Sequence, residues 1–226
     1  INTVYNDTKK KDLSWDYKED AFTFIIKHEK LLNNCSRQFF LNDGPLAFLP
    51  INQNNTSLVW SLSKNSEMRK IVNSKLSLEK YLNSNFLIYK NVKLNSKIES
   101  FSLKFNFLTC GIEPRKINIG DINHRIHPIA GQGWNMTVRD IKQLYDVYQD
   151  KKKYGYDFGD FSLLEEYEKK TKINNFVFAS SIDLIRRIFK FNNKKISNLR
   201  KSGFRQLDKF PDLKNEIIKF ADEGLS

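Results

Sequence analysis

The first half of the chain alternates apolar and polar residues, which is the pattern of half-buried strands. In residues 21–28, Phe22, Phe24 and Ile26 occupy every second position. Similar short runs follow at 37–41, 46–51 and 57–62. The sequence Asn42-Asp43-Gly44-Pro45 is a strong turn signal between two of these runs. Consecutive strands joined by short turns predict an antiparallel sheet with one covered face.

The hydrophobic period changes after residue 62. Apolar spacing in residues 63–83 predicts two short helices, with a helix start near Ser77. Alternation returns in residues 86–89 and 98–108. In the longer of these runs, one predicted face carries Phe101, Leu103, Phe105 and Phe107. Residues 111–115 then form a predicted connection to the centre of the chain.

The second half has helical spacing. Residues 135–148 and 161–190 carry apolar residues three and four positions apart. The predicted apolar positions of the first helix are Met136, Val138, Ile141, Leu144, Tyr145 and Tyr148. Those of the second include Phe178, Ile182, Ile185 and Phe189. The lysines at 151–153 predict a solvated helix end or loop, and two further helices are predicted at 197–207 and 212–223, the last starting near Pro211.

Residues 117–140 have the most distinctive layout. A short alternating run predicts a strand that ends at Gly120 and Asp121, and Pro128 with Gly131-Gln132-Gly133 predicts an irregular turn before the helix. Glycine lets the backbone approach a ligand closely. A helix N-terminus offers free N–H groups and partial positive charge. The layout therefore fits a site for an anion or polar ring, and it also fits an ordinary strand–turn–helix connection.

Length and charge set broad limits. The chain has 226 residues, 40% of them hydrophobic, which is enough for a core in one domain or two coupled domains. No apolar run is long enough to span a bilayer, and no signal peptide is visible. The net charge of +12 suits contacts with nucleic acid, anionic lipid or acidic ligands. A Lys-, Asn- and Ile-rich composition, as produced by an AT-rich coding sequence, accounts for it equally well.

The cysteines and histidines are the residues that could bind a transition metal. Cys35 and Cys110 have no metal-like spacing, which predicts packed thiols in a reducing compartment rather than a disulfide framework. His124 and His127 could supply three ligands together with Asp121. Their spacing crosses a turn and no fourth ligand is apparent, so no metal site is predicted.

The central stretch resembles the second flavin-binding motif of the FAD-dependent aromatic hydroxylases of the para-hydroxybenzoate hydroxylase type. The matching residues are Gly120-Asp121, His124, His127-Pro128-Ile129-Ala130-Gly131-Gln132-Gly133, Asn135 and Arg139-Asp140. The form H-P-I-A-G-Q-G-x-N-x-x-x-R-D is most similar to the ubiquinone-biosynthesis branch, the 2-polyprenyl-6-methoxyphenol hydroxylase type. Two departures are Trp134, where the family often has a small aliphatic residue or Phe, and Ile122-Asn123, where it has Ala-Ala.

Other segments extend the resemblance over nearly the whole chain. Residues 43–50 and Ser57-Leu58-Val59-Trp60 are similar to the family's G-P-L-A-x-L-P…S-x-V-W segment. Trp15-Asp16-Tyr17, His28-Glu29 and the tail from Leu199-Arg200 through Gly203 to Pro211-Asp212-Leu213-Lys214 also fit. The chain starts with Ile and contains no G-x-G-x-x-G turn, with which such hydroxylases begin. We therefore interpret it as roughly the C-terminal half of such an enzyme, inactive when alone.

The resemblance implies an α+β chain that forms part of an α/β flavin monooxygenase fold. An antiparallel substrate-domain sheet with two short helices is expected at 1–112, a return to the FAD-binding domain at 113–150, and a C-terminal helical region at 151–226. Residues 46–50 and 59–60 would form part of the substrate wall or, equally, plain core.

The resemblance also implies an FAD site. Its residues would be Gly120, Asp121, Pro128, Gly131, Gln132, Gly133, Trp134 and Asn135. Asp121 would hold ribityl hydroxyls or neighbouring atoms near the phosphates. Backbone N–H groups of the glycine turn would face the pyrimidine edge of the flavin, and the helix N-terminus would stabilise the anionic reduced flavin. No catalytic residue is assigned.

The implied function is an FAD-dependent monooxygenase that hydroxylates a polyprenylated phenol in ubiquinone biosynthesis through a flavin hydroperoxide. It would use molecular oxygen and electrons from NAD(P)H or another donor. It would be cytoplasmic and peripheral to the inner face of the membrane, with other ubiquinone-biosynthesis proteins as partners and no nucleic acid. The alternatives are a flavin hydroxylase of the same fold acting on another aromatic substrate, and a non-catalytic basic membrane-binding module.

A basic segment at residues 186–205 bears on the membrane prediction. It contains no acid and carries Arg186, Arg187, Lys190, Lys194, Lys195, Arg200, Lys201 and Arg205. Aromatic and aliphatic residues lie between these cations. The segment predicts either a surface for anionic lipid or a solvated face.

Overall fold

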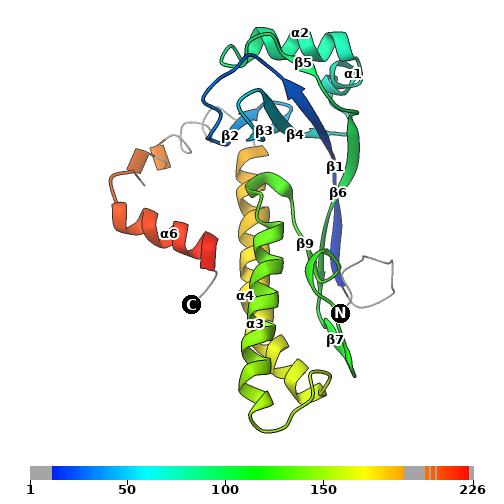
Figure 1. Ribbon diagram of the computed structural model, residues 1–226, viewed down its shortest axis with the longest axis vertical. Coiled ribbons are helices and arrows are strands. Elements are labelled where there is room, and N and C mark those ends of the chain that lie inside the picture. Colours follow the sequence, from blue (N-terminus) through cyan, green and yellow to red (C-terminus); the bar gives the residue numbers. More distant parts are fainter. Residues whose placement is uncertain (1–11, 191–201, 204, 207, 224–226) are drawn as a thin grey trace. The chain divides into compact units, whose positions relative to one another are not determined.

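The computed structural model describes residues 12–190, 202–203, 205–206 and 208–223 (Figure 1). The strands are β1 (Asp12–Lys27), β2 (Arg37–Leu41), β3 (Gly44–Pro50), β4 (Asn55–Ser63), β5 (Lys93–Leu94), β6 (Glu99–Leu108), β7 (Ile112–Glu113), β8 (Lys116–Ile117) and β9 (His124–Arg125). The helices are α1 (Met68–Val72), α2 (Lys75–Asn85), α3 (Gly133–Lys152), α4 (Phe161–Lys190) and α6 (Pro211–Glu223), with the 3₁₀ turns η1 (Gly120–Ile122) and η2 (Pro128–Ala130). The predicted α+β class is confirmed.

The chain divides into two compact units. The sheet unit spans Asp16–Leu103, and the motif unit combines the chain up to Trp15 with the chain from Lys104 onward. Strands β1 and β6 each cross this boundary. The division falls near residue 103, and the segments 113–150 and 151–226 both belong to the motif unit. The predicted functional regions stay predictions.

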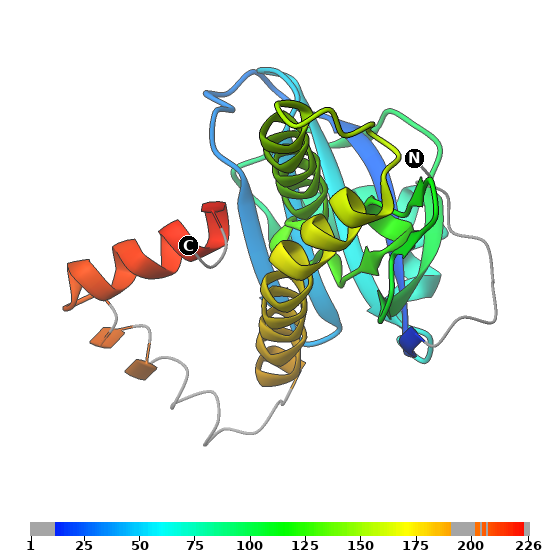
Figure 2. The same ribbon diagram turned by 90° about the horizontal axis from the view of Figure 1, so that it is seen from below.

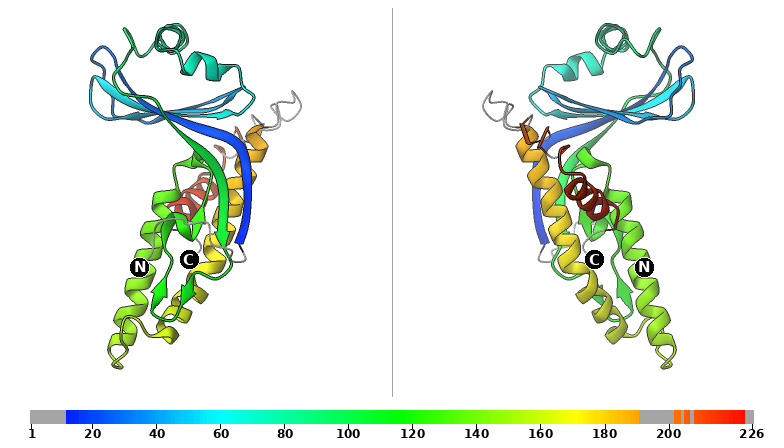
Figure 3. Two further views of the ribbon diagram at one scale, coloured as in Figure 1. Left: turned by 90° about the vertical axis from the view of Figure 1, so that its right-hand side faces the viewer. Right: turned by 90° about the vertical axis from the view of Figure 1, so that its left-hand side faces the viewer.

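The sheet unit is an antiparallel sheet with helices on one side. Its strand order includes β2-β3-β4-β1. Leu46 and Phe22 both lie opposite Trp60 in the strand register. Figure 3 shows α1 and α2 on the same side of this sheet. The face toward them is fully buried and includes Leu46, Phe48, Leu58 and Trp60, which pack with Val72, Leu78 and Leu82 of the helices.

Because successive side chains of a strand point to opposite faces, the segments predicted as a substrate wall are split. Phe48 and Trp60 belong to the packed core, so they do not line an open wall. Ala47 and Val59 are paired on the opposite face and are only half-buried. Any substrate wall on this sheet is therefore the face of Ala47 and Val59.

Two local predictions in the sheet unit were wrong. Helix α2 begins three residues earlier than expected, because the Ser74 side chain accepts a hydrogen bond from the Ser77 N–H and caps the helix. Residues 86–89 form a turn rather than a strand, with the Tyr89 N–H bonded to the Phe86 carbonyl. Both aromatic rings nevertheless enter the core, and Tyr89 stacks on Phe48.

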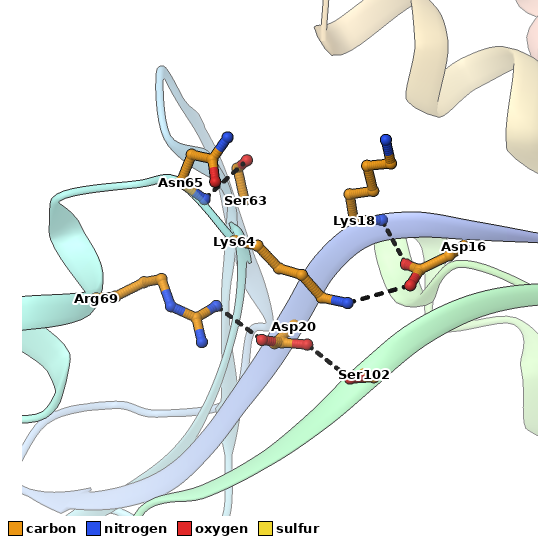
Figure 4. A network of polar contacts seen from close by, with 8 residues as sticks. All are labelled: Asp16, Lys18, Asp20, Ser63, Lys64, Asn65, Arg69 and Ser102. Atoms are coloured by element: carbon orange, nitrogen blue, oxygen red, sulfur yellow. Dashed lines mark hydrogen bonds and ion pairs between the residues drawn. The ribbon is translucent and has the colours of Figure 1, made fainter.

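A polar network links β1 to its neighbours in the sheet unit (Figure 4). The Asp20 carboxylate accepts hydrogen bonds from Arg69 Nη1 at 2.7 Å and from Ser102 Oγ at 2.9 Å. The Asp16 carboxylate accepts hydrogen bonds from the backbone N–H of Lys18 in the same strand at 2.6 Å and from Lys64 Nζ at 3.1 Å. These contacts attach helix α1 and the end of β4 to the long strand β1.

The motif unit is built on two long helices. Helices α3 and α4 run antiparallel and side by side (Figures 1 and 2). The limits of α4 are those predicted, and the lysines at 151–153 do mark the end of α3. The buried stripe of α3 is Met136, Asp140, Leu144 and Val147. The prediction was wrong for Val138, Ile141 and Tyr145, which are exposed. The face that is buried includes Asp140, and a search for apolar residues alone does not find that face.

Several other expectations also differ from the structure. Phe105 and Phe107 of β6 are buried as predicted, whereas Phe101 of the same predicted face is exposed. Ile185 of α4 is exposed, although Phe178 and Ile182 are buried. Both cysteines are free and exposed rather than packed.

The basic segment is only partly described. Arg186 is buried, whereas Arg187 is exposed and donates to Asp183 one turn earlier in α4 at 2.6 Å. Lys194, Lys195, Arg200 and Lys201 lie outside the described residues, as does most of the helix predicted at 197–207. In the described part of the chain, no helix combines the length and apolar character needed to cross a bilayer.

Candidate functional site

The central motif begins with a glycine that shapes the backbone. Gly120 has a φ of +76°, and a Cβ there would lie 3.3 Å from the side chain of Thr137, the fifth residue of α3. A glycine therefore brings η1 against the start of α3. Asp121 follows in η1, where its side chain is exposed and makes no hydrogen bond or ion pair with any other described residue. The carboxylate is free to accept hydrogen bonds from a ligand.

The start of α3 is open. Gly131 ends η2 with a φ of +64°, and α3 begins at Gly133 with no side chain capping its first N–H groups. A Cβ on Gly131 or Gly133 would have no atom within 4 Å. The Asn135 side chain donates to Gln132 Oε1 at 2.7 Å and so shapes the turn from within. A ligand can reach these backbone N–H groups without displacing a side chain.

The eight residues predicted for the site belong to η1, η2 and the start of α3. They are Gly120, Asp121, Pro128, Gly131, Gln132, Gly133, Trp134 and Asn135, and all except Gly120 are at least partly exposed. The structure brings their two ends together through Gly120 and Thr137. A free carboxylate beside an uncapped helix start fits a ligand with hydroxyl groups and a polar, electron-rich edge. The residues present therefore fit a flavin, although their individual contacts to one stay predictions.

The motif histidines have structural partners. His127 Nδ1 accepts a hydrogen bond from the Ile129 N–H at 3.1 Å and caps η2. His124 Nε2 lies 2.6 Å from Asp140 Oδ2. Among the described residues, no three His, Cys, Asp or Glu side chains are grouped as metal ligands.

Sequence reasoning missed the role of Asp140. This residue is 1% exposed, accepts from His124, and also accepts from Asn175 Nδ2 of α4 at 2.7 Å. The signal was present in the sequence, because Asp140 lies four residues after Met136 and four before Leu144, in the stripe that a helix buries. An acid in such a stripe indicates a buried hydrogen-bonded carboxylate.

Tyr167 of α4 lies close to this carboxylate. Burial, and then the negative charge of Asp140, raise the pKa of the Tyr167 phenol far above its ordinary value. The phenol therefore stays protonated at neutral pH.

A small pocket adjoins the same group of residues. Its lining includes Asn118, Asn123, Tyr167, Thr171 and Asn175. None of the eight predicted site residues lines it, so it is distinct from the open surface at the start of α3.

Comparisons with known proteins agree with the sequence resemblance. No protein-family model matches the chain. The 3-demethoxyubiquinol 3-hydroxylase of Escherichia coli strain K12 is 28% identical over 209 residues, which are 92% of this chain and 53% of that protein. The ubiquinone biosynthesis monooxygenase COQ6 of Dictyostelium discoideum is 31% identical over 212 residues, 80% of this chain and 43% of that protein. The chain is a homologue of the ubiquinone-biosynthesis monooxygenases.

The family homology confirms the resemblance inferred from the motif. The chain spans about half the length of the curated relatives it matches. The solved structure of pqsL, a probable FAD-dependent monooxygenase from Pseudomonas aeruginosa, superposes with a TM-score of 0.63 at 17% identity. The superposition covers 79% of this chain and 50% of the pqsL chain. The fold is therefore that of part of a flavin monooxygenase, as predicted.

Proposed function

We propose that the polypeptide containing this chain is an FAD-dependent monooxygenase that hydroxylates a polyprenylated phenol in ubiquinone biosynthesis. The proposal is supported by one observation: in a chain homologous to ubiquinone-biosynthesis monooxygenases, the exposed Asp121 belongs to the turn η1, which packs against the helix α3 whose start is uncapped. The bound FAD, once reduced with electrons from NAD(P)H or another donor, supplies the activation of molecular oxygen. One oxygen atom enters the aromatic ring and the other leaves as water.

The chain's own residues bind and orient the cofactor in this proposal. Asp121 accepts hydrogen bonds from flavin hydroxyl groups, which are charge-assisted and therefore strong. The N–H groups of Gly133, Trp134 and Asn135 face the polar edge of the ring, where the helix N-terminus favours negative charge. Because the N–H groups are fixed before reaction, charge that develops on the ring is stabilised without reorganisation.

The substrate would lie against the half-buried face of the sheet unit. Ala47 and Val59 present small apolar side chains there, with Thr23 opposite Val59 in the register. Such a surface suits an aromatic ring with an apolar tail. The opposite face cannot serve, because Trp60 and Phe48 are committed to the core.

We further propose that the enzyme works in the cytoplasm at the inner membrane surface, together with other ubiquinone-biosynthesis proteins. A substrate with a polyprenyl tail resides in lipid, which supports this placement. Arg186 is buried and is therefore a poor lipid contact, whereas Arg187 is exposed and also pairs with Asp183. The attachment would therefore rely on the residues of the basic segment other than Arg186.

The test uses the complete polypeptide, purified and assayed for bound FAD and for NAD(P)H-dependent oxygen uptake. We expect stoichiometric flavin and formation of a hydroxylated product from a phenol with a short prenyl chain. Turnover of the same phenol without the prenyl chain should be much slower. Equal turnover of both would favour a hydroxylase for another aromatic substrate. Absence of flavin would contradict the proposal as a whole.

A further inference from the structure

A buried carboxylate connects three elements of the motif unit. Asp140 on α3 accepts from His124 of β9 at 2.6 Å and from Asn175 of α4 at 2.7 Å. His124 is 1% exposed, and Asn175 is also buried. Both carboxylate oxygens are therefore used, one toward each neighbouring element. Asp140 fixes β9 and α4 against the same turn of α3.

The hydrogen-bonding pattern gives the protonation state of His124. The Asp140 carboxylate can only accept, so the imidazole proton lies on Nε2. His124 Nδ1 is buried and has no partner among the described residues. A second proton there would be a buried donor without an acceptor, which is costly. The geometry therefore favours the Nε2–H tautomer of His124, with Asp140 as its acceptor.

This connection joins the same two segments that carry the predicted flavin contacts. His124 follows Asp121 by three residues, and Asp140 follows Gly133 by seven, about two helical turns. The hydrogen bond therefore joins the segment that carries the Asp121 carboxylate to the helix that carries the open N–H groups. Movement of His124 away from Asp140 would change the separation of the two predicted flavin contacts.

Packing alone does not require an acid at this position. Met136 and Leu144 lie one turn to either side in the same buried stripe, and an apolar residue between them would complete it. Buried polar groups cost free energy unless they are hydrogen-bonded, and apolar replacements are often neutral or stabilising. The bonds to His124 and Asn175 instead impose a definite geometry on the loop.

We propose that Asp140 is a positioning residue that, through His124 and Asn175, sets the spacing between Asp121 and the N-terminus of α3 for flavin binding. The inference rests on the proposed function, because it assumes that these two groups contact FAD. It assigns no contact with the cofactor to Asp140, His124 or Asn175. The three side chains act through the backbone segments that they hold.

The test compares two substitutions of His124 in the complete polypeptide. His124→Gln retains a side-chain N–H donor at a similar reach, whereas His124→Leu has similar bulk and no donor. We expect His124→Leu to raise the FAD dissociation constant about tenfold or more and His124→Gln to stay within about threefold of the parent. The visible absorption bands of bound flavin should shift in His124→Leu alone. Asp146→Ala, which removes an exposed acid from the same helix, is the matched control and should match the parent.

Thermal unfolding without flavin separates positioning from stability. If His124→Leu lowers the unfolding temperature but binds FAD with the parental affinity and spectrum, the bond is only structural and the inference is overturned. If His124→Leu does not fold, Asn175→Ala decides, since it removes one donor and leaves the His124 bond in place. Asn175→Ala should weaken FAD binding, and parental binding would overturn the inference. A parent without FAD would instead contradict the proposed function.

Discussion

Two of the three buried histidines, one from each unit, are held in different ways. In the sheet unit, His28 Nδ1 donates to the Glu29 carbonyl at 2.7 Å and Nε2 accepts from Thr56 Oγ1 at 2.9 Å. Both ring nitrogens therefore have neutral partners. In the motif unit, His124 donates to the Asp140 carboxyl group from one nitrogen, and its other nitrogen has no partner among the described residues.

The difference shows what each histidine does. The His28 group is closed: Thr56 Oγ1 also accepts from Asn33 Nδ2 at 2.9 Å, and Asn33 donates to the Asn52 carbonyl. Such a set ties loop ends to a sheet and contributes stability alone. The His124 group contains a buried carboxylate and joins the segments that carry an exposed carboxylate and an open helix start. Its hydrogen bonds therefore fix the geometry of a surface site rather than the packing of a core.

The largest expected effect is a loss of stability on truncating Trp60 in the core of the sheet unit. Trp60 is 0% exposed and packs with Tyr81 in the sheet unit. Trp60→Ala should lower the free energy of unfolding by roughly 3–5 kcal/mol, because it leaves a large cavity. Trp134→Ala is the control: this residue is 75% exposed, and its loss should change stability by less than about 0.5 kcal/mol. Denaturant unfolding of both variants measures the difference, and similar values would contradict the assigned core.

The second prediction sharpens the comparison between the histidines. His28→Leu should cost about 1–3 kcal/mol of stability, because it leaves buried partners without a hydrogen bond. The FAD dissociation constant of the complete polypeptide should not change, since every partner of His28 described above belongs to the sheet unit. His124→Leu should change both quantities. A flavin affinity that falls equally in the two variants would show that the distinction between the two groups is wrong.

The smallest expected effect is a pH dependence at the ends of α3 and α4. Hydrogen bonds from Lys151 and then Lys170 lower the pKa of Glu166 below its ordinary value. A lowered folded-state pKa stabilises the protein above the unfolded pKa, and this stabilisation is lost as the pH falls through the folded value. Glu166→Gln should therefore be slightly less stable than the parent at neutral pH. The difference should vanish in acid, as followed by thermal unfolding over a pH series. A difference that persists in acid would contradict this pairing.

Sequence patterns predicted the elements where one period dominates. Strand β2 and helix α4 have the predicted limits, because β2 is a short apolar run that ends at a strong turn signal and α4 has a long helical stripe. The turn at Phe86 and Tyr89 was misread, since two core aromatics three residues apart fit either structure. The chain division near residue 103 depends on contacts between distant segments, which no local pattern contains.

The part of the candidate site that is local in the sequence was predicted, and the part that depends on distant residues was not. Glycines and Asp121 form a contiguous motif, so the sequence identified the whole exposed stretch. The sequence indicated Asp140 only as a residue of that motif and not its role, because its partners His124 and Asn175 lie on other elements. Only the folded chain shows that an acid in an apolar stripe meets a histidine from β9 and an amide from α4.

The central claim is that the Asp121 carboxylate binds FAD rather than shaping a turn. The chain offers a matched control, because Asp43 also sits beside a glycine of positive φ, Gly44, and accepts from Ser66 Oγ within the sheet unit. The decisive measurement is the FAD dissociation constant of the complete polypeptide, with Asp121→Ala and Asp43→Ala compared with the parent. Loss of a charge-assisted hydrogen bond of about 1.5–3 kcal/mol predicts roughly ten- to a hundredfold weaker binding for Asp121→Ala, and parental binding for Asp43→Ala. Parental affinity in Asp121→Ala would contradict the account, because Asp121 would then be only a turn residue.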